Sequence, residues 1–168
     1  MLTVTETVFE RVARAVIDSI SDALTYHNLD VPERRFVGFS RPAEDACPDL
    51  VAWVSNIRPW DQNFPDGRAN TTLNNFFNGW AFDVNVRLGV CVIDFDGNGQ
   101  PLDGELLEEW SSTLYHYAHT MYVDWVHRWR AGQVNELSEC DYVDVGACTD
   151  YKEGGCGGWE FRITVGVL

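Results

Sequence analysis

The feature that most constrains the fold is a strand pattern over residues 79–95, in which apolar residues alternate with polar or small ones as far as Cys91. A period of two places every second side chain on the same side of an extended strand. The apolar positions are Trp80, Phe82, Val84, Val86, Leu88, Val90 and Val92. This pattern predicts a strand with one buried face. A strand buries such a face only as part of a sheet that packs against other elements.

Weaker strand patterns flank this one. Residues 49–57 and 141–147 are rich in β-branched and other apolar residues, and residues 35–39 match a short strand within a proline-containing loop. The last run, residues 159–168, follows a glycine cluster at 154–158. Because loose termini fray, its position predicts that this run is tied into the sheet.

Two segments show helical periodicity. Residues 5–27 carry apolar residues at spacings of three and four, with Thr5 or Thr7 as the capping residue. Residues 103–131 predict a second, longer helix that Gly132 ends. Its expected core-facing stripe consists of Leu106, Trp110, Leu114, Tyr117, Met121, Trp125 and Trp129.

The order of these elements predicts the fold class. Helices and strands do not alternate one by one, so we expect an α+β fold rather than a parallel α/β fold. The sheet is expected to be mostly antiparallel or mixed, with the N-terminal helix and the second long helix packed on it. The length of 168 residues suits a single domain, residues 1–168.

The long polar connection after the second strand contains two aromatic residues, Trp60 and Phe64. An exposed aromatic residue in such a loop predicts an anchor of a protein interface, with packing inside the loop as the alternative. Asp61 and Asp66 lie in the same connection and are expected to be exposed at the interface, and Glu153 is expected in an exposed loop further on.

The glycine cluster at 154–158 predicts a flexible turn. It precedes a strand, so it lacks the helix N-terminus on which a phosphate-binding loop depends. Glycines also permit close approach of a neighbouring backbone, which makes Gly155 and Gly157 candidates for contact with another subunit.

The charge excludes several classes of function. The net charge is −14, and such a surface repels nucleic acid, whereas a sequence-specific DNA-binding protein needs a basic face. The sequence predicts neither a signal peptide nor a membrane span. The five cysteines form an odd set, which favours reduced, buried thiols over a disulfide framework.

One spacing matches a calcium-binding loop. Asp94, Asp96, Asn98 and Glu105 occupy the ligand positions of the EF-hand pattern, with a glycine after the asparagine. A strand precedes this segment where an EF-hand has a helix. The stronger interpretation is therefore a strand-to-helix turn in which Asp103 caps the helix.

Other metal-ligand and catalytic patterns are weak. Cys140, Cys148 and Cys156 are eight residues apart, whereas zinc ligands are usually paired at shorter spacing. His116 and His119 are expected to be solvated on the second helix, and His27 to face the dipole at the end of the first. No nucleophile-elbow or phosphate-loop motif occurs. We therefore expect no enzyme activity, no cofactor and no metal.

Three segments together carry a family resemblance: Arg87-Leu-Gly-Val-Cys91 in the long strand, the Asp96–Pro101 turn before the second helix, and Gly154–Glu160 before the last strand. With the N-terminal helix and the length, they resemble the tail terminators of siphophages that infect actinobacteria. The resemblance covers most of the chain as an order of elements and some twenty residues as motif.

The resemblance implies a small α+β structural protein of the virion neck or tail that assembles in the host cytoplasm. Tail terminators cap the tail tube as a hexameric ring and join it to the head connector, and they have no catalytic residues. The expected partners are further copies of the chain, the tail tube protein and the head–tail connector, while DNA passes the lumen without specific binding. A head–tail stopper, connector or tube protein is the nearest alternative, and a calcium-dependent binding module is a more distant one.

Overall fold

The computed structural model describes residues 6–41, 47–60, 79–91, 103–153 and 156–167. Their elements, in chain order, are α1 (Val8–Tyr26), β1 (Arg34–Gly38), β2 (Asp49–Trp60), β3 (Gly79–Cys91), α2 (Gly104–Ala118), the π-helical turn η1 (His119–Asp124), α3 (Trp125–Arg130), α4 (Asn135–Ser138), β4 (Tyr142–Val145), β5 (Thr149–Glu153) and β6 (Cys156–Val167). The predicted α+β class, with an N-terminal helix and a second long helix, is confirmed.

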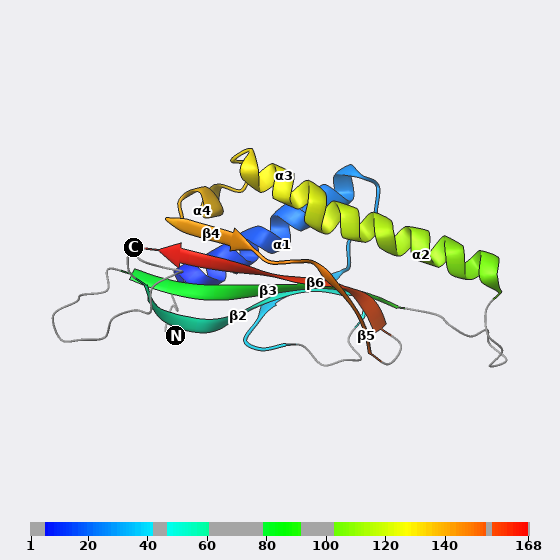
Figure 1. The fold of residues 1–168 in the computed structure, drawn as a ribbon, viewed down its shortest axis with the longest axis horizontal. Helices are drawn as coiled ribbons and strands as arrows, with labels where there is room; N and C mark the ends of the chain where they lie inside the picture. Colours follow the sequence, from blue (N-terminus) through cyan, green and yellow to red (C-terminus); the bar gives the residue numbers. More distant parts are fainter. Residues whose placement is uncertain (1–5, 42–46, 61–78, 92–102, 154–155, 168) are drawn as a thin grey trace.

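The strands form one mixed sheet in the order β1-β2-β3-β6-β4. β1 is parallel to β2, and the other pairs are antiparallel. β4 and β5 both pair with the second edge of β6, one at each half of that strand. The helices lie on one side of the sheet (Figure 1). β1 therefore ends the sheet on one side, and β4 with β5 end it on the other.

The predicted alternation of β3 forms the centre of the core from Phe82 to Leu88, whereas Trp80, predicted on the same buried face, is 45% exposed. Phe82, Val84, Val86 and Leu88 are fully buried on the side of the sheet that the helices cover. The ring of Phe9 in α1 packs edge-on against Phe82, with 4.7 Å between ring centroids. Residues at the intervening positions point to the other side of the sheet, which the helices leave open.

α1 begins where the sequence allows the best cap. The Thr7 side chain accepts a hydrogen bond from the backbone N–H of Glu10, and the Glu10 carboxylate accepts one from the backbone N–H of Thr7. This reciprocal pair satisfies two otherwise free donors and lowers the pKa of Glu10, chiefly through the backbone bond. Of the two predicted caps, Thr7 is the one confirmed.

The second helix differs from its prediction in two respects. It starts after Asp103, which caps it as expected, but η1 interrupts its regular α-helical turns before α3. Only the later part of the expected stripe is core, since Tyr117, Met121 and Trp125 are buried whereas Leu106 is 45% exposed. The reason is visible in Figure 1, where the start of α2 extends past α1 and the body of the sheet.

Several boundaries also differ. β2 continues through Trp60, where the sequence predicts a loop, and β6 starts at Cys156, inside the predicted glycine turn. Glu153, predicted in a loop, is the last residue of β5. The expectation of reduced thiols is wrong for Cys47, which is disulfide-bonded, while Cys140 and Cys148 are free.

Candidate assembly surfaces

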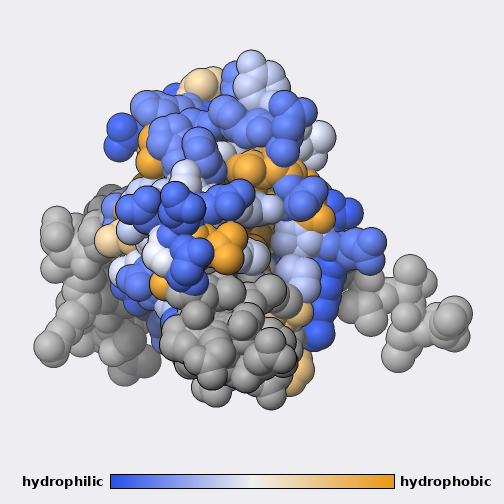
Figure 2. All heavy atoms as spheres, turned by 90° about the vertical axis from the view of Figure 1, so that its right-hand side faces the viewer, coloured by the Kyte–Doolittle hydropathy of each residue, from blue (hydrophilic) through white to orange (hydrophobic). Residues whose placement is uncertain are grey.

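Most of α2, residues 104–116, carries apolar side chains that the fold does not cover; we call it the α2 arm. Leu106 and Leu107 are 45% and 40% exposed, and Tyr115 is 65% exposed. Figure 2, which faces this end of the molecule, shows hydrophobic surface between hydrophilic residues. An apolar surface of this kind at the end of a helix is typical of a contact with another macromolecule.

The arm is attached to the sheet through β6. The indole N–H of Trp159 donates a 2.8 Å hydrogen bond to the backbone carbonyl of Leu114, and the rings of Trp159 and Tyr115 are 6.2 Å apart. Between arm and sheet lies a groove of about 270 Å³, which we call the arm groove. Its lining side chains come from α2, β5 and β6: Leu107, Trp110, Leu114, Tyr115, Asp150, Tyr151, Lys152 and Trp159.

The charge of the arm is strongly negative. Asp103, Glu105, Glu108 and Glu109 are exposed around it, and no lysine or arginine occurs between Asp103 and Asp124. In the part of the chain that the structure describes, none of the three glutamates forms an ion pair. The arm therefore presents apolar and acidic side chains together.

The opposite edge of the sheet is basic. β1 begins with the exposed residues Arg34 and Arg35, and Phe39 directly after it is 97% exposed. The Arg34 guanidinium lies over the ring of Phe36, 5.2 Å from its centroid. Among the described residues, Arg34 and Arg35 have no carboxylate partner, and no strand pairs with the outer edge of β1. We call Arg34–Phe39 the β1 edge.

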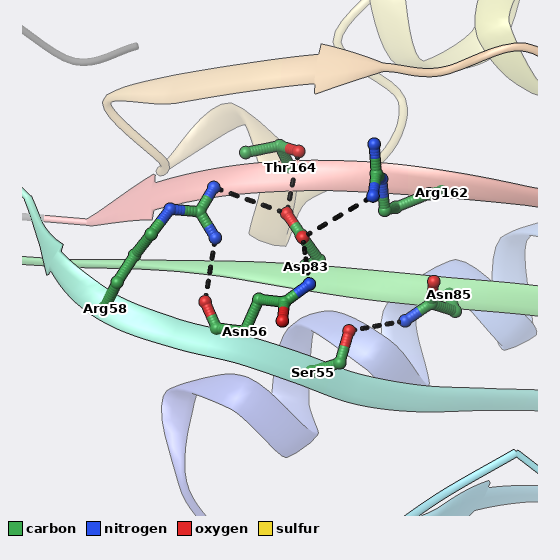
Figure 3. Close-up of polar contacts among 7 residues, drawn as sticks. All are labelled: Ser55, Asn56, Arg58, Asp83, Asn85, Arg162 and Thr164. Atoms are coloured by element: carbon green, nitrogen blue, oxygen red, sulfur yellow. Dashed lines mark hydrogen bonds and ion pairs between the residues drawn. The ribbon is translucent and has the colours of Figure 1, made fainter. Parts of the chain in front are cut away.

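The open face of the sheet carries a polar cluster centred on Asp83 (Figure 3). Its carboxylate, 6% exposed, accepts hydrogen bonds from Asn56 Nδ2 at 2.9 Å and Thr164 Oγ1 at 2.8 Å. The guanidinium groups of Arg58 and Arg162 lie 3.5 and 3.9 Å from it. Because four partners from β2 and β6 surround this carboxylate of β3, it is suited to holding three strands in register.

The same cluster explains a distortion of β2. The pairing of β2 with β3 shifts between Ser55 and Arg58, and Asn56 has a φ of 51°. Asparagine tolerates this left-handed conformation better than most residues, and its side chain is the one that donates to Asp83. The bulge thus delivers the amide of Asn56 to the carboxylate.

A buried ion pair lies further along the same face. Arg87 Nη2 donates to Asp49 Oδ2 at 2.8 Å, and both side chains are at most 2% exposed. The Arg87 guanidinium stacks on the ring of Tyr151 at 5.3 Å. Asp49 Oδ1 and two Arg87 nitrogens have no hydrogen-bond partner in the described part. A charge held this deeply serves the packing of β2, β3 and β5.

Histidines gather near the π-helical turn. The Asp124 carboxylate contacts the imidazole of His27 and lies 3.6 Å from His119 Nδ1, so His27 has a carboxylate neighbour in addition to the expected helix end. A broad groove of about 890 Å³ lies beside them and includes His116. Among the described side chains, no hydroxyl or thiol donates to a histidine, and no set of three His, Cys, Asp or Glu side chains is arranged to hold a metal.

Partial burial disfavours the reactive thiolate form of the two free cysteines. It raises the pKa of Cys140 and that of Cys148 to about 11, with nearby carboxylates as a smaller cause. Cys140 Sγ also lies 3.1 Å from the backbone carbonyl of Glu136. A nucleophilic cysteine needs a lowered pKa, so these two side chains have the properties of core residues.

The sequence-predicted site residues are placed as follows. Trp60 ends β2, with its backbone paired to Gly79, and Glu105 is exposed in the first turn of α2. Gly157 is buried in β6 between Val90 of β3 and Lys152 of β5, so its own chain already occupies both sides. The other candidates lie outside the described residues: Asp61, Phe64, Asp66, Asp94, Asp96, Asn98 and Gly155.

Sequence reasoning missed the β1 edge and the exposed part of the arm. For the arm a signal existed, because the glutamates on both sides of Leu106 and Leu107 disfavour burial of this turn of the helix. The exposure of Phe39 had no such signal, since a lone aromatic residue beside a strand is equally typical of a core.

No helix among the described segments is long and apolar enough to cross a membrane. The chain matches no protein-family model, and no curated protein matches it in sequence. What can be concluded about function therefore depends on the surfaces described above and on the resemblance of the three sequence segments.

Proposed function

We propose that this chain is a structural virion protein, a tail terminator that caps the tail tube as a ring, with six copies expected from the family resemblance. The observation that carries the proposal is the α2 arm. It holds apolar residues away from the core, where they serve no purpose in an isolated subunit. A subunit of a stacked ring needs such surfaces for its lateral and axial neighbours.

The polar groups of the described segments support a non-catalytic role. Asp83, Asp49 and Asp124 are each held by cationic or polar partners of the same chain. An active site instead keeps a nucleophile, a base and an oxyanion donor directed at a shared position. In this proposal the protein acts through its shape and its contacts and converts no substrate.

The partners in this proposal are the tail tube protein on one side of the ring and the head–tail connector on the other. The net charge of −14 suits a lumen through which DNA slides without being held, since phosphate contacts would retain it. A head–tail stopper, connector or tube protein shares the same requirements and is the nearest alternative.

Electron microscopy of tail tubes tests the proposal. Tube protein encoded with this chain is polymerised with and without the purified full chain. A tail terminator is expected to bind at one tube end, to limit tube length and to remain there as a ring. Tubes of unchanged length with bare ends would contradict the terminator assignment, and binding along the tube wall would favour a different tail component.

A further inference from the structure

We propose that the arm groove receives the β1 edge of a second copy of this chain. This contact would join neighbouring subunits of the proposed ring, and it rests on the self-assembly that the proposed function requires. It identifies the two surfaces that meet, both of which are described above by their residues.

The charges of the two surfaces are complementary. Asp150 lines the arm groove, and the α2 arm beside it carries three exposed glutamates, while the β1 edge carries Arg34 and Arg35. Lys152 is the cation among the groove-lining residues of the described part. Opposite charges that have no carboxylate or guanidinium partner among the described residues of their own chain favour a contact between chains and disfavour other pairings.

The apolar groups are complementary as well. Phe39 is 97% exposed and projects from the end of β1, and the groove offers the side chains of Leu107, Trp110 and Trp159. Its volume of about 270 Å³ is below the usual range for a small-molecule site, and it suits an inserted side chain. Aromatic anchors that fill pockets of this kind dominate the binding energy of interfaces.

The positions of the surfaces decide which assembly they make. β1 is at one end of the strand order, and β5, which forms one wall of the groove, lies at the other end beside β6. Each copy can therefore donate its β1 edge to one neighbour and accept the β1 edge of another. Such heterologous contacts generate a ring when the rotation between subunits closes.

The contact also resolves a problem of the β1 edge. An exposed edge strand with unpaired backbone groups is a site of uncontrolled association unless it is covered or charged. Arg34 and Arg35 provide the charge, and the α2 arm of a neighbour provides the cover. The exposed leucines of the α2 arm are in turn removed from water by this contact.

The test measures self-association of the full chain by sedimentation velocity. Phe39→Ser is expected to weaken assembly by roughly thirty-fold or more, as for removal of an anchor residue. Tyr26→Ser is the matched control, because Tyr26 is an aromatic residue of α1 that is 75% exposed and belongs to neither the arm groove nor the β1 edge, so its loss is expected to leave assembly unchanged. Circular dichroism checks that both variants fold like the wild type.

A charge exchange makes the test specific to this pair of surfaces. Reversal of Arg34 and Arg35 to Glu, or of Glu108 and Asp150 to Arg, is expected to weaken assembly, and the variant with both reversals is expected to assemble better than either. Assembly by Phe39→Ser equal to that of the wild type would overturn the inference, and so would a combined variant that is no better than its parents.

The outcomes separate this inference from the proposed function. Rings that form despite these substitutions overturn the assigned surfaces and leave the tail terminator proposal in place. A wild-type chain that remains monomeric at every concentration overturns the contact between copies, while binding to tube ends decides the terminator proposal independently.

Discussion

The buried Arg87–Asp49 pair provides a quantitative test of how the sheet is held together. Arg87→Leu leaves the carboxylate of Asp49, which is 0% exposed, without its cation. Removal of one partner from a buried pair typically costs about 3–5 kcal/mol of unfolding free energy, a large part of the stability of a domain. For a chain of this size, that corresponds to a fall in Tm of roughly 6–20 °C.

The double variant Asp49→Val with Arg87→Leu is expected to recover most of this loss. It removes both charges, so no carboxylate remains buried without a counter-ion. The native pair is itself incompletely satisfied, because Asp49 Oδ1 and Arg87 Nε have no hydrogen-bond partner in the described part. We therefore expect the free energy of unfolding of the double variant to lie within about 2 kcal/mol of the wild-type value.

Urea denaturation followed by circular dichroism and tryptophan fluorescence measures these free energies. Arg162→Leu is the matched control, since the Arg162 side chain is 59% exposed and its guanidinium lies 3.9 Å from the Asp83 carboxylate. Because Asp83 keeps Asn56, Thr164 and Arg58 as partners, loss of this exposed cation is expected to cost at most about 1 kcal/mol. Two results would contradict this account of the buried pair. One is a loss of unfolding free energy in Arg87→Leu no larger than that in Arg162→Leu. The other is a loss in the double variant equal to the sum of the losses in the two single variants.

Three further predictions concern backbone contact, thiol chemistry and calcium. Gly158→Ala is expected to lower Tm, because the added Cβ would overlap the carbonyl oxygen of Leu88 and cost about 1–3 kcal/mol or more of unfolding free energy. Gly104→Ala is the control, and because it has open space around it, it is expected to leave Tm unchanged or raise it slightly. Cys140 and Cys148, with pKa values raised from 9.0 to about 11, are expected to react with iodoacetamide at pH 8 at about one hundredth of the rate in urea-unfolded chain, and alkylation at equal rates in both states would contradict their burial. Because both pKa values are higher in the folded state, the stability that these thiols contribute is present below pH 9 and is lost as the pH rises towards 11. Calcium in excess over chelator is expected to leave Tm unchanged, and a stabilisation approaching 2.7 kcal/mol, about that of a ligand at one hundred times its dissociation constant, would instead identify a calcium site.

The parts of the fold that the sequence predicts are those in which local pattern and burial agree. The alternation of β3 and the stripe of α1 correspond to the buried residues at the centre of the core. Thr7 caps α1 and Asp103 caps α2, because their side chains are adjacent in sequence to the donors they satisfy. In these places the interactions that decide the structure span only a few residues.

The missed parts depend on contacts between distant residues. β5, with the sequence Thr-Asp-Tyr-Lys-Glu, has no apolar alternation and becomes a strand because β6 offers it a free edge. The exposed leucines of the α2 arm have helical periodicity, yet the core ends before it reaches them. A periodic pattern gives the direction of a side chain and not the extent of the layer beneath it.

The candidate surfaces likewise combine features that are evident from the local sequence with features that depend on contacts between distant residues. The acidic composition of the arm is evident from the sequence, and so is the pair Arg34–Arg35. Their places at opposite edges of one sheet follow from the strand order β1-β2-β3-β6, which no local signal contains. The candidate Gly157 failed to indicate an open surface for the same reason, since its neighbours β3 and β5 come from distant parts of the chain.

The central claim is that this protein acts by assembling with copies of itself. Negative-stain electron microscopy of the purified full chain at increasing concentration, alone and with tail tubes, tests it most directly. The account predicts closed rings with six-fold symmetry, free in solution or seated on one end of each tube. Single subunits at the highest concentration, combined with tube ends that remain bare, would contradict it.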